Sequence, residues 1–184
     1  RFEDLLKEFV EIPSVSADPD RKRDLERCAE LGLETVRAFG GKADLHRVPG
    51  GPPVVLGSFE AGKACPTLTI YNHLDVVPAS RETEPWRTEP FAFTKQGDTY
   101  FGRGTTDDKG PALSALYGAR AAIDAGVPIN VKLLWELEEE VGSPHFADTL
   151  KAIGPAAATD AVVVSDTVWV SRGRPAVSSG LRGL

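Results

Sequence analysis

The sequence predicts an α/β protein of three layers (αβα), with helices on both faces of a mixed, mostly parallel sheet. Apolar segments rich in β-branched residues alternate along the chain with segments of helical period. These apolar segments show little alternation of apolar and polar residues, which indicates strands that are buried on both sides. With 184 residues, of which 41% are hydrophobic, the chain can bury one core, so we expect one domain over residues 1–184.

Two helices are expected at the start of the chain. Apolar residues recur at helical spacing over residues 2–10, and Pro13 favours an end soon afterwards. An Asp-Pro pair at 18–19 is typical of a helix start, and a Gly-Gly pair at 40–41 is typical of a helix end. The second, longer helix should therefore lie between these two pairs.

The period then changes from helical to extended. Three strands are predicted at residues 43–48, 53–60 and 67–77, and turns rich in Gly and Pro separate them. Residues 79–98 have no regular period and are expected to form a long loop, which in a compact domain is more often functional than idle. A short strand that runs into a turn follows at 99–104.

The second half of the chain continues the alternation. Small and apolar residues at 107–126 predict a largely buried helix, and a further helix at 143–154 should be capped by Ser143. Apolar strands are expected at 129–137 and 160–166. Ligand sites in open α/β sheets collect at the carboxyl ends of strands, so the residues that follow these strands are the first candidates for function.

Charge and composition exclude several classes of partner. The net charge is -6, and no stretch gathers the basic residues, so we expect no nucleic-acid partner. No window reaches the roughly 18 apolar residues of a membrane helix, and the first residues lack the pattern of a signal peptide, so we expect no membrane association. Cys28 and Cys65 lack metal-type or redox-type spacing and are expected to be packing residues in a reducing cytoplasm.

Four polar clusters follow predicted strands or begin a helix: "NHLD" at 72–75, "TTDDKG" at 105–110, "ELEEE" at 136–140 and "SD" at 165–166. Each alone has a simpler explanation, as a satisfied histidine, a solvated glutamate run or a helix cap. Together they place an imidazole and many carboxylates, without cysteine, at one edge of the sheet, where like charges repel. A divalent cation would offset this repulsion, and the donor set suits zinc, manganese or cobalt.

Separate roles can be assigned within these clusters. Positions i and i+2 of a strand face the same way, so we expect His73 to bind metal and Asp75 to orient its ring. If Glu140 binds metal, Glu139 can act as the base for a metal-activated water, as metal-assisted hydrolysis requires. The alternative is that Glu138–Glu140 merely open a loop or a helical turn.

The motifs "NHLDVVP", "GRGTTDDKGP", "ELEEEVGS" and "VVVSDTVW" occur in this order. With them the chain, from about Leu5 onward, resembles the dinuclear metallopeptidases that include carnosinase-type dipeptidases, aminoacylases, glutamate carboxypeptidases and desuccinylases. The resemblance implies that His73, Asp107 and Asp166 hold one of two divalent metal ions, with zinc as the expected metal. It also implies that Asp107 bridges to a second metal bound by Glu140, that Glu139 is the general base, and that the peptide bond after Asp107 is often cis.

The resemblance also implies a reaction, the hydrolysis of an amide bond by a metal-bridged water that Glu139 activates. "TTDDKGP" and "SDTVW" look more like the dipeptidase branch, which favours dipeptides or short peptides as substrates. Deacylation of N-acyl amino acids is the nearest alternative. Four basic residues either attract a substrate carboxylate or serve as structural partners: Arg103, Lys109, Arg172 and Arg182.

The sequence departs from the family at its end. In the family a histidine from far down the chain completes the second metal site, and a lid and dimerisation domain usually follows the "GLRG" element. We therefore expect residues 1–184 to be a partial catalytic domain of a homodimer that forms through the missing domain. His46 and His145 are the only substitutes for the missing histidine.

Two hypotheses compete with catalysis of this kind. A metal-binding module that kept the fold and lost activity would be favoured by a missing base or bridging residue, yet Glu139 and Asp107 are both present. Phosphoryl transfer would need a phosphate-binding loop of the GxxxxGK[ST] type, and "GRGTTDDKG" does not match that pattern.

Overall fold

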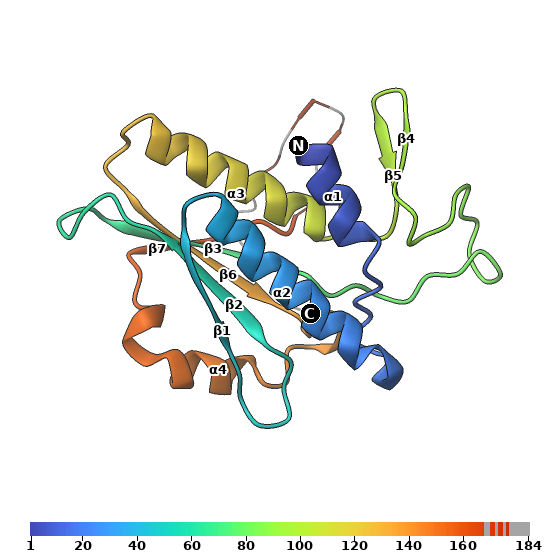
Figure 1. Ribbon diagram of the computed structural model, residues 1–184, viewed down its shortest axis with the longest axis horizontal. Helices are drawn as coiled ribbons and strands as arrows, with labels where there is room; N and C mark the ends of the chain where they lie inside the picture. Colours follow the sequence, from blue (N-terminus) through green and yellow to red (C-terminus); the bar gives the residue numbers. More distant parts are fainter. Residues whose placement is uncertain (168–169, 172, 175, 177–184) are drawn as a thin grey trace.

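The computed structural model describes residues 1–167, 170–171, 173–174 and 176. A five-stranded sheet runs through the centre, with the strand order β1-β2-β6-β3-β7 (Figure 1). Its strands are β1 (Lys42–His46), β2 (Val54–Phe59), β3 (Thr67–His73), β6 (Asn130–Glu136) and β7 (Ala161–Val164). Each of them lies within or overlaps a strand that the sequence predicts.

The sheet is mixed. β3 pairs in parallel with β6 and β7, whereas β1 with β2, and β2 with β6, pair antiparallel. The three-layer α/β fold is confirmed, but a parallel arrangement holds only for the half that contains β6, β3 and β7, because an apolar segment does not encode its own direction. In that half His73 lies opposite Glu136, so β3 and β6 end together at one edge of the sheet.

Helices cover both faces of the sheet (Figure 1). On one face lie α1 (Phe2–Val10), α2 (Lys22–Ala38) and α3 (Lys109–Asp124), and on the other lies α4 (Phe146–Ile153). β6 serves both faces, since Leu133 and Trp135 join the larger core under α1–α3 while Leu134 joins the smaller core under α4. Successive residues of a strand point to opposite faces, which is why one apolar run can supply two cores.

Close packing of α2 on the sheet depends on Gly32. A Cβ atom at this position would lie 3.2 Å from Leu74, and 3.3 Å from both Trp135 and Val55. All three of these side chains are buried. The absence of a side chain at Gly32 therefore lets the helix approach the sheet directly above the strand ends that carry the site.

The structure differs from the sequence-based prediction at three places. The Asp-Pro start of the second helix is a short 3-10 turn, η1 (Pro19–Arg21), ahead of α2. The predicted loop at 79–98 contains β4 (Thr94–Gln96), which forms a hairpin with β5 (Thr99–Phe101). The prediction that Ser143 caps a helix is wrong, because α4 begins only at Phe146 and the Ser143 hydroxyl bonds elsewhere. Two further 3-10 turns are η2 (Glu139–Val141) and η3 (Gly154–Ala157).

None of the helices in the described part of the chain has the length and apolar character needed to cross a membrane. The two cysteines are free thiols, as expected for packing residues, with Cys28 buried and Cys65 partly exposed.

Candidate metal centre

The imidazole of His73 lies at the centre of the acidic cluster. It is completely buried at the end of β3, yet its Nε2 atom faces three carboxylates. Nε2 lies 3.0 Å from Oδ1 of Asp107, 3.7 Å from Oδ2 of Asp166 and 3.9 Å from Oε2 of Glu139. Asp107 comes from the turn before α3, Asp166 from the segment after β7, and Glu139 from η2. Their side chains are 56, 30 and 38% exposed respectively, so a ligand can reach them from solvent.

Two sets of potential metal ligands share His73. One set adds Asp107 and Asp166, and the other adds Glu139 and Glu140; within each set, one ligand atom from every residue lies within 4.8 Å of the others. Imidazole nitrogen and carboxylate oxygen are donors that zinc and similar divalent ions accept. The residues therefore fit a divalent cation, and the four ligands predicted from the sequence lie together. That they bind metal stays a prediction.

Asp75 lies behind His73 and contacts both the histidine and η2. Its Oδ1 atom lies 3.3 Å from Nδ1 of His73, and its backbone carbonyl oxygen lies 3.0 Å from the same nitrogen. Its carboxylate also accepts the backbone N–H groups of Glu139 at 3.2 Å and Glu140 at 3.1 Å. Asp75 thus contacts the ring at Nδ1, on the side away from Nε2. It also holds the turn that carries both glutamates. Of these contacts, only that between Asp75 and the ring of His73 is predicted from the sequence.

Asp107 and Asp108 are adjacent but serve different surroundings. The peptide bond between them is cis, as the resemblance implies. Oδ2 of Asp108 accepts hydrogen bonds from the Asn72 side chain at 2.7 Å and the His73 backbone at 3.1 Å. Burial raises the pKa of Asp108 to about 7, although these hydrogen bonds act in the opposite direction. Asp108 therefore supports the end of β3, as expected of a residue that is not a ligand. Asn72 was not singled out from the sequence, and its only signal is a polar side chain at the end of an apolar strand.

The cluster holds more negative than positive charge. Burial alone would lower the pKa of His73, but Asp75, Asp108 and Asp107 together raise it to about 10. Burial raises the pKa of Glu140, and the negative charge of Asp107 adds to that effect. One imidazolium among so many carboxylates leaves an excess of negative charge, and a divalent cation is the group that would offset it.

Only two of the four glutamates in the "ELEEE" segment face His73. Glu139 and Glu140 belong to a ligand set, whereas Glu136 and Glu138 are buried and bonded to other parts of the protein. The glutamates that are crowded in the sequence are thus divided in the structure between two that lie beside His73 and two that are bonded elsewhere. Spacing alone could not show which glutamates lie beside His73 and which are bonded elsewhere.

The other two histidines lie outside the cluster. The carboxylate of Glu138 accepts the backbone N–H of His145 at 2.7 Å and lies 2.9 Å from its Nδ1. His46 ends β1, the outermost strand on the side of the sheet away from β3 and β7. Among the described residues, neither histidine belongs to a ligand set with His73.

Of the basic residues near the site, Lys109 has a structural role. Its buried ammonium donates hydrogen bonds to the carbonyl oxygens of Phe9 at 2.8 Å and Ile12 at 2.7 Å, so it is not available to a substrate. The guanidinium of Arg103 lies 5.1 Å from the centre of the Trp86 ring. Arg172 and Arg182, the remaining two candidates, lie outside the described residues.

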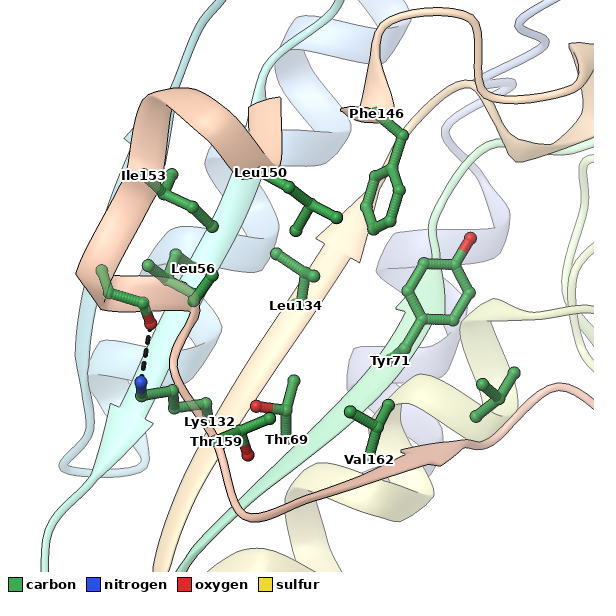
Figure 2. A pocket seen from close by; sticks show the side chains of 13 residues that line it. Leu56, Thr69, Tyr71, Lys132, Leu134, Phe146, Leu150, Ile153, Thr159 and Val162 are labelled. Atoms are coloured by element: carbon green, nitrogen blue, oxygen red, sulfur yellow. Dashed lines mark hydrogen bonds between the residues drawn. The ribbon is translucent and has the colours of Figure 1, made fainter. Parts of the chain in front are cut away.

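A separate apolar pocket of about 440 Å³ lies between the sheet and α4 (Figure 2). Leu56, Leu134, Leu150 and Ile153 supply much of its wall, and the ring of Tyr71 closes one side. None of the predicted ligands lines it. This apolar pocket and the predicted metal ligands are therefore in different places.

The fold and the site define a class, that of α/β proteins with a histidine and carboxylate cluster at the ends of parallel strands, which is a type of site that binds divalent metals. The chain belongs to one family of that class: the pattern of Peptidase family M20/M25/M40 matches residues 69–178. The recognition of a metallopeptidase family from the sequence motifs is thereby confirmed.

Several relatives of the chain are dipeptidases by name. It is 35% identical to the Cys-Gly metallodipeptidase dug1 of Schizosaccharomyces pombe, over 97% of this chain and 40% of that protein. It is 32% identical to the Beta-Ala-His dipeptidase of Rattus norvegicus, over 99% of this chain and 40% of that protein. The structure of the di-peptidase Dug1p from Saccharomyces cerevisiae superimposes with a TM-score of 0.80 at 31% identity, over 91% of this chain and 38% of that chain. The chain thus spans about two fifths of the length of these relatives.

Proposed function

We propose that this chain carries the catalytic centre of a metal-dependent peptidase that hydrolyses the amide bond of dipeptides or short peptides. The observation that carries the proposal is the position of Nε2 of His73, which faces carboxylates from three separate segments at distances of 3.0 to 3.9 Å. Membership of the peptidase family and the names of the relatives support the reaction and the substrate class.

His73, Asp107 and Asp166 would hold one metal ion, and Glu140 would hold a second, with Asp107 shared between the two. Zinc is the metal that we propose, because it accepts both imidazole and carboxylate donors. Divalent ions bound there would supply Lewis acidity toward the substrate carbonyl and lower the pKa of water. A histidine for the second ion would come from outside these 184 residues, since His46 and His145 lie elsewhere.

The chain's own residues then divide the proton chemistry. Oε2 of Glu139 is the base that takes a proton from the attacking water and later delivers it to the leaving nitrogen. Asp75 holds Nδ1 of His73, which keeps Nε2 directed at the cluster. The same carboxylate binds the Glu139 amide, so one buried side chain positions both the ligand and the base.

Replacement of the base tests this proposal. In the complete gene product, Glu139→Gln should lower turnover of a dipeptide by about 10²–10⁴-fold, the usual contribution of a positioned base. Its zinc content, measured by mass spectrometry, should stay that of the unsubstituted protein. The matched control is Glu60→Gln, which removes an exposed carboxylate just after the end of β2 and should keep activity. Turnover of the Glu139 variant close to the unsubstituted level would exclude Glu139 as the base.

Two further measurements separate the alternatives. Asp107→Asn should lose both metal ions, and a variant that retains two would contradict a shared ligand. A panel of dipeptides and N-acyl amino acids, each assayed with and without chelator, distinguishes a peptidase from a deacylase. Activity that survives complete removal of metal would overturn the proposal.

The oligomer and the cellular location that the sequence suggests also stay predictions. A homodimer is expected for the complete gene product and can be checked by light scattering. A cytoplasmic location can be checked by fractionation of the source cells.

A further inference from the structure

We infer that Glu136 is a positioning residue, which together with Tyr71 and Ser143 fixes the turn that presents Glu139 and Glu140 to the metal site. This inference rests on the proposed function, because it gives that turn its purpose. None of the three positioning side chains belongs to the ligand sets around His73.

Glu136 lies at the junction between the end of the sheet and the turn. On its backbone side, the carbonyl oxygen accepts the N–H of Leu74 at 2.8 Å, and this fixes the backbone between His73 and Asp75. On its side-chain side, Oε1 accepts hydrogen bonds from the hydroxyl of Tyr71 and, at 3.0 Å, from the hydroxyl of Ser143. One buried residue therefore links the strand that ends in the histidine to the far end of the glutamate turn.

Ser143 closes the turn in a backbone conformation that residues other than glycine rarely adopt. Its φ angle is +51°, and the preceding Gly142 has a φ of +85°. A positive φ at a residue other than glycine is uncommon and is kept only where the surroundings hold it. The Ser143 backbone N–H bonds to the carbonyl of Glu138 at 2.9 Å, and its hydroxyl bonds to Glu136. Both bonds oppose relaxation of the turn.

Tyr71 is held by packing so that its hydroxyl reaches Glu136. Its ring stands in the wall of the apolar pocket, with the hydroxyl directed away from the leucines, as Figure 2 shows. The ring makes an edge contact with Phe146, with 5.7 Å between ring centres and 79° between ring planes. Phe146 is the first residue of α4. The ring of Tyr71 is therefore held by its contact with this helix, and its hydroxyl is held by the hydrogen bond to Glu136.

The two ends of the turn are thus held by different carboxylates. Asp75 binds the amides of Glu139 and Glu140 at the start, and Glu136 binds Ser143 at the end. A buried carboxylate is costly unless it is well paired, and Oε2 of Glu136 has no hydrogen-bond partner among the described residues. For packing alone, a neutral or apolar residue would have a lower free-energy cost of burial at this position. The acid is therefore best explained by the two donors that it holds.

The experiment removes each donor separately. Tyr71→Phe and Ser143→Ala delete single hydroxyls and leave the carboxylate in place. Tyr117→Phe is the matched tyrosine control, because its hydroxyl is buried without a partner among the described residues. Ser114→Ala is the matched serine control, because in the described part of the chain its hydroxyl bonds only to the carbonyl of Gly110 within α3. Circular dichroism first confirms that all four variants of the complete gene product are folded.

The first measurement needs no metal. Hydrogen exchange of the peptide covering residues 137–143 in the metal-free protein should be about tenfold faster in Tyr71→Phe and Ser143→Ala, roughly the effect of one lost hydrogen bond to a carboxylate. It should be unchanged in both controls. The second measurement, zinc titration against a chromophoric chelator, should show about tenfold weaker binding in the same two variants. For dipeptide hydrolysis, kcat should fall about tenfold while KM stays within about twofold.

The outcomes separate this inference from the proposed function. Faster exchange in the two test variants, in a protein that binds no zinc even without substitution, would keep the positioning role and sink the proposed metal site. Zinc binding by the unsubstituted protein, combined with exchange and affinity in both variants equal to those of the controls, would overturn the positioning role alone. A uniform fall in stability, without faster exchange in residues 137–143, would also overturn it, since that is the effect of a purely structural residue.

Discussion

Oδ1 of Asp75 lies 3.3 Å from Nδ1 of His73, and both side chains are completely buried. The same carboxylate binds the amides of Glu139 and Glu140, so its charge is shared among an imidazole and two backbone donors. Such a contact fixes the orientation of the ring and strengthens Nε2 as a ligand. The geometry leads to a direct test of the link between this residue and metal affinity.

Replacement of Asp75 by Asn should weaken zinc binding by about 10–100-fold, because the neutral amide cannot support the ring and the two amides as a carboxylate does. Zinc titration against a chelator measures the change. Asp44→Asn is the control, since that carboxylate is exposed on β1 and should leave affinity unchanged. Equal affinity in the two variants would show that the Asp75 contact does not matter for the metal.

Zinc affinity should increase with pH. His73 has a pKa raised to about 10 in the metal-free protein, and zinc takes the neutral imidazole, so binding must displace a proton at any lower pH. Between about pH 7.5 and 8.5 one displaced proton gives about a tenfold gain in affinity. Asp108, with a pKa of about 7, is mostly ionised in that window and adds little. Calorimetry in buffers of different ionisation enthalpy counts the protons, and release of none would contradict a neutral His73 ligand.

Loss of the Lys109 ammonium should destabilise the fold. Lys109→Met leaves the carbonyls of Phe9 and Ile12 buried without their donor, and we expect a loss of about 2–4 kcal/mol in the free energy of unfolding. Lys132→Met is a matched control, because Lys132 also donates to two carbonyls, those of Ala156 and Ala158, but these bonds are exposed. It should lose less than about 1 kcal/mol. Denaturant titration measures both, and similar losses would contradict the role of burial.

A methyl group at Gly110 should displace the segment that carries Asp107. A Cβ atom there would lie 2.0 Å from the carbonyl oxygen of Thr105, so Gly110→Ala should cost about 3 kcal/mol and weaken zinc binding as well. Gly118→Ala in the same helix is the control: a Cβ atom there meets nothing within 4 Å, and the change should stabilise by about 0.5–1 kcal/mol. Thermal and chelator titrations give both quantities. A Gly110 variant as stable as its control would show that the turn tolerates the methyl group.

Much of the fold was predictable because the period of the apolar residues differs between strand and helix. The apolar runs that end in His73 and in Glu136 predict two strands, and the helix between them predicts their parallel pairing. Strand direction at the other side of the sheet was not predictable, since the apolar pattern of β2 (Val54–Phe59) indicates a strand but not its direction. Its antiparallel pairing with β6 (Asn130–Glu136) depends on contacts across more than 70 residues of chain.

In the site, the identity of the clustered residues was predictable and their partners were not. His73 ends a strand, Asp166 follows one and Asp107 precedes a helix, and these positions are visible in the sequence. The expected cap at Ser143 failed because its hydroxyl is bonded to Glu136, seven residues earlier, in a turn with positive φ angles. Hydrogen bonds to backbone amides, such as those that Asp75 accepts, leave no trace in residue type at the donor position.

The outer edge of β7 bears on how the 184-residue chain behaves when concentrated. Val162, Val163 and Val164 are 58, 46 and 54% exposed, and among the described residues β7 pairs only with β3. The unpaired edge of an apolar strand is a template on which another polypeptide can add a strand. We expect turbidity to develop as this chain is concentrated. At micromolar concentrations, with a mild detergent present, the chain should stay monodisperse.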